Sequence, residues 1–83
     1  MDVRLTIPAG APYPQLAGAL AGKFAEYSGA NAGAAGRLAA QVEALAAKLG
    51  GGPDITVTLE AVDRQVRVTA AAGERHEHTI FPL

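Results

Sequence analysis

Hydrophobic and polar residues alternate in two parts of this chain, at its start and over its last third. Residues 3–7 set Val, Leu and Ile between Arg and Thr, which is the period-two pattern of a half-buried strand. The same alternation covers residues 55–70 and is interrupted at Asp63-Arg64. It therefore predicts an antiparallel hairpin with its turn at those two residues. Residues 76–81 are expected to add a last short strand.

Helical spacing occupies the stretch between these strands. The prolines and glycine at 8–12 break the first strand, and Pro14 fits the first turn of a helix over about residues 14–28. The large side chains of this helix share one face: Tyr13, Leu16, Leu20, Phe24 and Tyr27. A second helix is predicted from Asn31, its N-cap, to the three glycines at 50–52. Its apolar face holds Ala35, Leu38, Val42, Leu45 and Leu49.

The chain is expected to form a single domain, 1–83, because a second domain would have no core of its own. A chain of 83 residues buries only about 60–65% of its unfolded surface. Apolar residues make up 49% of it, but many are alanine. With no cysteine to form a disulfide, a homodimer would add buried area. The larger core candidates are Val3, Leu5, Ile7, Leu16, Leu20, Phe24, Tyr27, Leu38, Val42, Leu45, Leu49, Ile55, Val57, Leu59, Val66, Val68, Ile80 and Phe81.

These elements predict an α+β fold, a two-layer α/β sandwich with the order β-α-α-β-β-β. Two helices would pack on one face of a mainly antiparallel sheet of three or four strands. The first strand is expected to pair into the sheet beside the hairpin.

The first helix carries a second stripe, made of small residues and lying almost opposite its large ones. Gly18, Gly22, Ala25 and Gly29 recur at three- and four-residue spacing. Glycine inside a helix costs about 1 kcal/mol relative to alanine, so its repeated use predicts the close approach of another backbone. That backbone is either the second helix of the same chain or a binding partner. Gly18, Gly22 and Ala25 are accordingly the candidate interface residues.

Charge and composition exclude several classes of function. Seven basic and eight acidic residues are scattered singly and give a net charge of −1, so there is no basic stripe for nucleic acid. No continuous apolar run is long enough to cross a membrane. The first residues also lack the basic and apolar regions of a secretory leader. We therefore expect a cytoplasmic protein that binds neither nucleic acid nor membrane.

The element order, together with the opening Thr6-Ile7-Pro8-Ala9, resembles the histidine-kinase-like ATPase fold, and within it the bacterial anti-sigma regulatory kinases. The resemblance runs from about residue 3 to residue 73. It implies a Glu on the second helix that activates water or a hydroxyl, followed four residues later by an Asn that holds magnesium. In the best register, Glu43 occupies the first position and Ala47 the second.

The resemblance also implies an Asp-x-Gly after a hairpin strand, where the Asp reads the adenine amino group. Ala71 stands at the Asp and Gly73 at the Gly. The segment that follows Gly73 does not contain the glycine-rich lid that closes over the phosphates. Alanine offers neither a metal ligand nor a hydrogen bond. What the resemblance implies is thus a truncated, nucleotide-free relative in which Glu43 and Gly73 are vestiges of the site.

The two histidines, His76 and His78, are two residues apart and would share one face of a strand. Both imidazoles would then be able to hold one metal ion, and a dimer would complete four ligands across its axis. Two ligands are only half of a zinc site. The alternative is a solvated strand edge with a titrating histidine pair.

We expect a small regulatory or protein-interaction module with a protein partner or a second copy of itself, without enzymatic activity or a cofactor. No serine lies on a sharp elbow, and no histidine is near one in the sequence. One alternative is a nucleotide- or metal-binding catalytic domain with an altered site that uses Glu43 and the histidine pair. The other is a structural homo-oligomer subunit.

Overall fold

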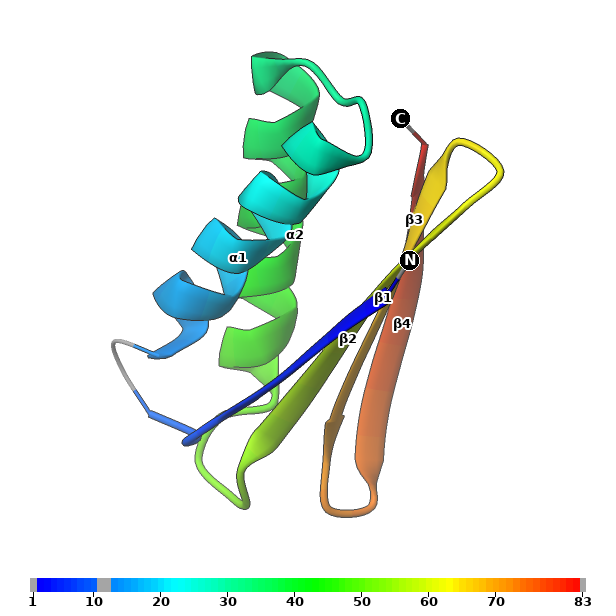
Figure 1. Ribbon diagram of the computed structural model, residues 1–83. Coiled ribbons are helices and arrows are strands. Elements are labelled where there is room, and N and C mark those ends of the chain that lie inside the picture. The colour runs from blue at the N-terminus through cyan, green and yellow to red at the C-terminus, as the bar shows by residue number, and fades with distance from the viewer. Residues whose placement is uncertain (1, 11–12, 83) are drawn as a thin grey trace.

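The alternating and helical segments form a two-layer fold, which a computed structural model describes for residues 2–10 and 13–82. The predicted β-α-α-β-β-β order is confirmed (Figure 1). The predicted break over 8–12 falls partly outside the described residues. The elements are β1 (Asp2–Ile7), α1 (Tyr13–Tyr27), α2 (Ala32–Lys48), β2 (Ile55–Val62), β3 (Gln65–Ala72) and β4 (Arg75–Pro82).

The sheet has four strands in the order β1-β2-β3-β4, and every neighbouring pair is antiparallel. The first strand pairs with β2, as predicted, and Ile7 lies opposite Ile55. Both helices cover the same face of the sheet (Figure 1). The outer face, which points away from the helices, is open among the described residues. β1 and β4 are the two edge strands.

Two tight turns connect the last three strands. Asp63 and Arg64 both have positive φ angles, 50° and 62°, as the central residues of a type I′ hairpin turn require. Gly73 has a φ of 63° and opens the two-residue turn between β3 and β4. A positive φ at the first central position alone is typical of a type II′ turn, where glycine is favoured. β3 continues to Ala72, two residues beyond the predicted end of the hairpin.

The ends of α2 follow the sequence signals. The Asn31 side chain accepts a hydrogen bond of 2.8 Å from the backbone N–H of Ala34, which confirms the predicted N-cap. The helix ends at Lys48, and Leu49 is its C-cap. The backbone N–H of Gly51 then donates to the carbonyl of Ala9, at 3.3 Å, which ties the loop after α2 to the segment after β1.

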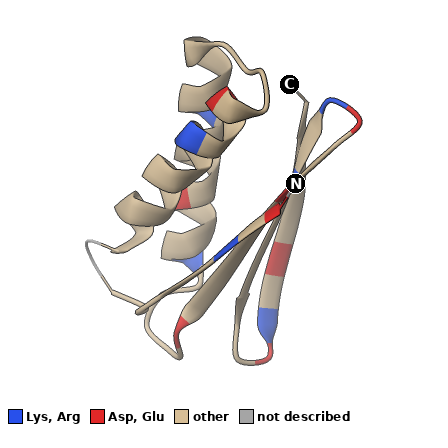
Figure 2. Ribbon diagram, viewed as in Figure 1, with Lys and Arg blue, Asp and Glu red and all other residues tan. Residues whose placement is uncertain are grey.

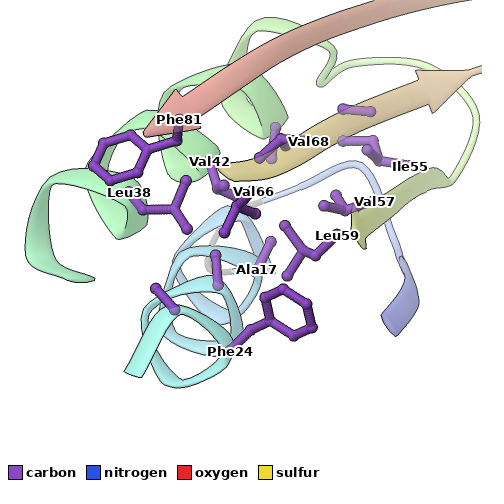
Figure 3. Close-up of a cluster of buried hydrophobic side chains, with 14 of the residues drawn as sticks. Ala17, Phe24, Leu38, Val42, Ile55, Val57, Leu59, Val66, Val68 and Phe81 are labelled. Atoms are coloured by element: carbon purple, nitrogen blue, oxygen red, sulfur yellow. The ribbon is translucent and has the colours of Figure 1, made fainter. Parts of the chain in front are cut away.

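The core lies between the two layers and is apolar throughout. No buried polar or charged residue occurs among the described residues. Figure 3 shows side chains from both layers interleaved there. α1 contributes mostly alanine, together with Phe24. The largest fully buried side chains come from α2, the loop after it, β2 and β3: Leu38, Leu49, Ile55, Leu59, Val42, Val57, Val66 and Val68.

Three large residues expected in the core lie on the surface instead. Leu16 is 54%, Tyr27 85% and Ile80 52% exposed. Ile80 alternates with the buried Phe81, so its side chain points to the outer face of the sheet. Leu16 and Tyr27 are exposed because the small face of α1 packs against α2, which turns most of the large face away from the core. Phe24, at one margin of the large face, is buried as predicted.

Candidate functional site

The close approach predicted from the small-residue stripe occurs between α1 and α2. A Cβ added to Gly18 would lie 2.7 Å from the backbone oxygen of Ala39, closer than real Cβ contacts allow. Ala25 is completely buried. Gly22 is half-buried, and a Cβ there would lie 3.5 Å from the oxygen of Ala35. Of the three candidate interface residues, a partner could therefore reach only Gly22, which lines a shallow groove between the two helices.

The positions implied by the ATPase resemblance do not come together in one site. Glu43 is exposed on α2, in the helical layer, and forms none of the ion pairs found among the described residues. Ala71 lies between the buried Ala70 and Ala72, so it points to the outer face of the sheet. Gly73 is in the β3–β4 turn, where its positive φ accounts for a glycine. Glu43 and Ala71 therefore lie in different layers of the fold.

His76 and His78 share the outer face of β4, as the two-residue spacing predicts. Both are exposed, and they lie opposite Ala71 and Thr69 of β3. Nowhere in residues 2–10 and 13–82 are three or more His, Cys, Asp or Glu side chains grouped so that they could hold a metal ion. Within one chain, the pair therefore supplies two ligands and no more.

β4 is attached to α2 by polar contacts at one end. The Lys48 ammonium lies 3.2 Å from Oε1 of Glu77, and Nη2 of Arg75 donates to the backbone oxygen of Lys48 at 2.6 Å. All of these groups are exposed, so the contacts position the strand more than they stabilise it. Beside them, a hollow between α2 and β4 is lined by Gln41, Ala44, Leu45 and Thr79.

The large residues of α1 form an apolar strip along the side of the helix that faces away from α2. We define the strip as Tyr13, Leu16, Leu20 and Tyr27. At 100° per residue these positions fall within a narrow arc, and they extend over about 21 Å of helix axis. Leu20 is half-buried and the other three are exposed. α1 contacts β1 and β2, so the strip lies on the side of the molecule that ends in the β1 edge.

The strip was missed because its spacing is also the pattern of a core-facing helix. The signal that could have found it is the glycine at position 18. The face that brings two backbones within van der Waals contact must point to the neighbouring helix. Large residues almost opposite that glycine are then left on the far side.

The charged groups do not form a site of one sign. Basic and acidic residues are dispersed over both layers (Figure 2). The ion pairs of the described residues are Lys23–Glu26, Lys48–Glu77 and Arg67–Glu60, all largely exposed. No helix in the described part of the chain has the length and apolar character needed to cross a membrane.

Comparison with known proteins gave no match to any family model, curated protein or solved structure. The features that can support a function are therefore those of the molecule itself. They are the apolar strip of α1, the histidine pair and the two open sheet edges.

Proposed function

We propose that this chain is a small regulatory or protein-interaction module that binds a protein partner through the apolar strip of α1. The observation that carries the proposal is the orientation of this helix. α1 buries alanines and Gly18 while Leu16 and Tyr27 remain exposed.

This orientation gives up stability within the single chain. Fully burying a leucine contributes about 1.5–3 kcal/mol, several times what an alanine methyl contributes. A small domain with an alanine-rich core has few other sources of that energy. Contiguous exposed apolar surface on a small domain marks an interaction site, and tyrosine is enriched in protein interfaces. A partner that covers the strip would recover the burial that the isolated chain forgoes.

The neighbouring edge of the sheet enlarges this surface. Val3 and Leu5 of β1 point to the helical side of the sheet but are only half-buried, because no further strand or helix of the described chain extends over them. A partner packed against the strip would cover these two side chains as well. Open strand edges and exposed helix faces are both used in peptide and protein recognition.

The proposal extends to a nucleotide-free relative of the anti-sigma regulatory kinases that acts in the cytoplasm. Its support is the element order, the opening Thr6-Ile7-Pro8-Ala9 and the alanines at positions 47 and 71. Glu43 and Ala71 belong to different layers, which argues against a retained nucleotide site. Protein binding is then the function that such a scaffold keeps.

Affinity capture with matched variants tests the binding surface. We expect proteins captured by the unaltered chain to be lost with the Leu16→Asp, Tyr27→Asp double variant. They should be retained by Ala40→Asp, which places a carboxylate on an exposed position of α2. Circular dichroism would verify that all three chains are folded. Capture of the same proteins by all three chains would show that the strip is not the binding surface.

Titration with Mg-ATP tests the absence of nucleotide binding. A one-site ligand at about 100 times its dissociation constant stabilises a protein by about 2.7 kcal/mol, which is easily seen as a higher melting temperature. We expect no binding heat and no change in melting temperature. Saturable binding that Glu43→Ala abolishes would refute the nucleotide-free reading and favour a catalytic domain with an altered site.

A further inference from the structure

The open edge of β4 presents the backbone groups of His76, His78 and Ile80. A two-residue turn connects β3 to β4, and the residues that flank it, Ala72 and Arg75, pair with each other. In such hairpins the flanking pair is hydrogen-bonded, so alternate residues starting with Arg75 direct their N–H and C=O groups toward β3. The residues between them direct these groups away from β3. The histidines therefore lie where another strand would hydrogen-bond.

The same two histidines point both imidazoles to one face. They are exposed on the outer face of the sheet and lie about 7 Å apart along the strand. Two imidazoles are half of a tetrahedral site of the kind that zinc occupies. The missing half must come from another strand that runs beside this edge and carries its own ligands on the same face.

A second copy of β4 is such a strand. When two copies pair antiparallel about a two-fold axis through Glu77, His76 of each copy lies directly opposite His78 of the other. The backbone groups of both residues then form the hydrogen-bonded pairs between the copies. Directly opposite residues have Cβ atoms about 4.5–5.5 Å apart, so all four imidazoles gather on one patch of the joined sheet. We propose that two copies of this chain pair through β4 and bind one zinc ion with His76 and His78 of each copy.

The surroundings of the edge fit a second copy. Glu77 would meet Glu77 of the second copy at the axis, but each carboxylate already has the ammonium of its own Lys48 at 3.2 Å. On the helical side, the hollow lined by Gln41, Ala44, Leu45 and Thr79 opens beside β4. Because of the two-fold symmetry, Gln41, Ala44 and Leu45 of the second copy's α2 would face this hollow. Ala44 is small enough to permit close packing of the two helices.

An unrelated extended peptide would pair with this edge equally well through its backbone. It would leave the two imidazoles without further ligands. The histidine pair therefore favours a second copy of this chain over other strands.

Sedimentation velocity with zinc or with EDTA tests the site on the full chain. We expect a monomer in EDTA and a doubling of mass with zinc, at one zinc ion for two chains. The His76→Gln, His78→Gln variant should lose this response. A monomer at saturating zinc would overturn the proposal, as would zinc-induced pairing that the double variant retains. The Leu16→Asp, Tyr27→Asp variant should still pair with zinc, because the α1 strip takes no part, so failure here and failure of the proposed function are distinguishable.

A cysteine placed at the axis tests the register, since the chain contains no other cysteine. Residues opposite each other in a non-hydrogen-bonded pair have Cα atoms about 4.5 Å apart, within the range that a disulfide spans. Glu77→Cys should therefore form a covalent dimer in zinc when the thiol oxidant diamide is added. Thr79→Cys, on the same face, would be about 13 Å from its counterpart and should not. Equal cross-linking of both variants, or of neither, would refute this register.

Discussion

Replacing Gly18 with alanine tests the packing that sets the orientation of α1. Two effects oppose each other. Alanine is favoured over glycine inside a helix by about 1 kcal/mol. Against this, the new methyl group would lie 2.7 Å from the backbone oxygen of Ala39 and 3.2 Å from Cβ of Glu43. A backbone atom of a helix cannot move aside as a side-chain tip can, so the two helices must separate.

Overpacking of this kind costs about 1–3 kcal/mol, so it outweighs the gain in helix propensity. We expect Gly18→Ala to lower the free energy of unfolding by about 1 kcal/mol, the difference of the two effects. Gly36→Ala is the matched control, because a Cβ there meets nothing within 4 Å. It gains the propensity alone and should raise stability by about 1 kcal/mol.

Urea unfolding followed by circular dichroism measures both variants. If the free energy of unfolding depends on urea concentration with the same slope in both variants, their transition midpoints should move in opposite directions. In thermal unfolding, the separation of about 2 kcal/mol between the two variants corresponds to roughly 8–16 °C for a domain of this size. If Gly18→Ala is stabilised as much as Gly36→Ala, the helices do not approach closely at this point. The account of why α1 exposes its large residues would then be wrong.

Three further substitutions each test one local feature of the structure. The hydroxyl of Ser28 is buried without a hydrogen-bond partner among the described residues, so Ser28→Ala should raise the melting temperature by relieving about 1 kcal/mol of desolvation. Asn31→Ala removes the acceptor for the N–H of Ala34 and should cost about 1 kcal/mol in urea unfolding. Arg64 has a φ of 62°, so Arg64→Gly should stabilise the hairpin by about 0.5–1 kcal/mol and raise the melting temperature. A loss of stability in Ser28→Ala or in Arg64→Gly, or unchanged stability in Asn31→Ala, would contradict the structural explanation given for that residue.

Local signals made the strands, turns and caps predictable. Alternation indicates which residues of a strand share a face, and Asp63-Arg64 lies between two alternating runs, so the hairpin could be placed from the sequence. Asn31 precedes a helical pattern and caps it through an atom three residues away. Each of these features depends on neighbours within a few positions.

The rotation of α1 and the make-up of a site depend on distant residues. Both faces of α1 are apolar, and the contact of Gly18 with Ala39 decides between them. The spacing of His76 and His78 predicted that they share a face, and they do. The separation of Ala71 from Glu43 was missed because the hairpin strand was expected to end at Ala70. β3 continues to Ala72, so its alternation places Ala71 on the outer face of the sheet.

The position of β1 has a consequence for the order in which the molecule folds. β2, β3 and β4 follow one another through two-residue turns, so they can assemble by local steps. β1 reaches β2 only after the whole helical hairpin is spanned, since Ile7 pairs with Ile55. Closing a loop of this length costs about 3 kcal/mol of chain entropy. β1 should therefore dock last and open first. Its amide hydrogens should exchange with solvent through local openings, whereas those of β2 and β3 should exchange only when the whole domain unfolds.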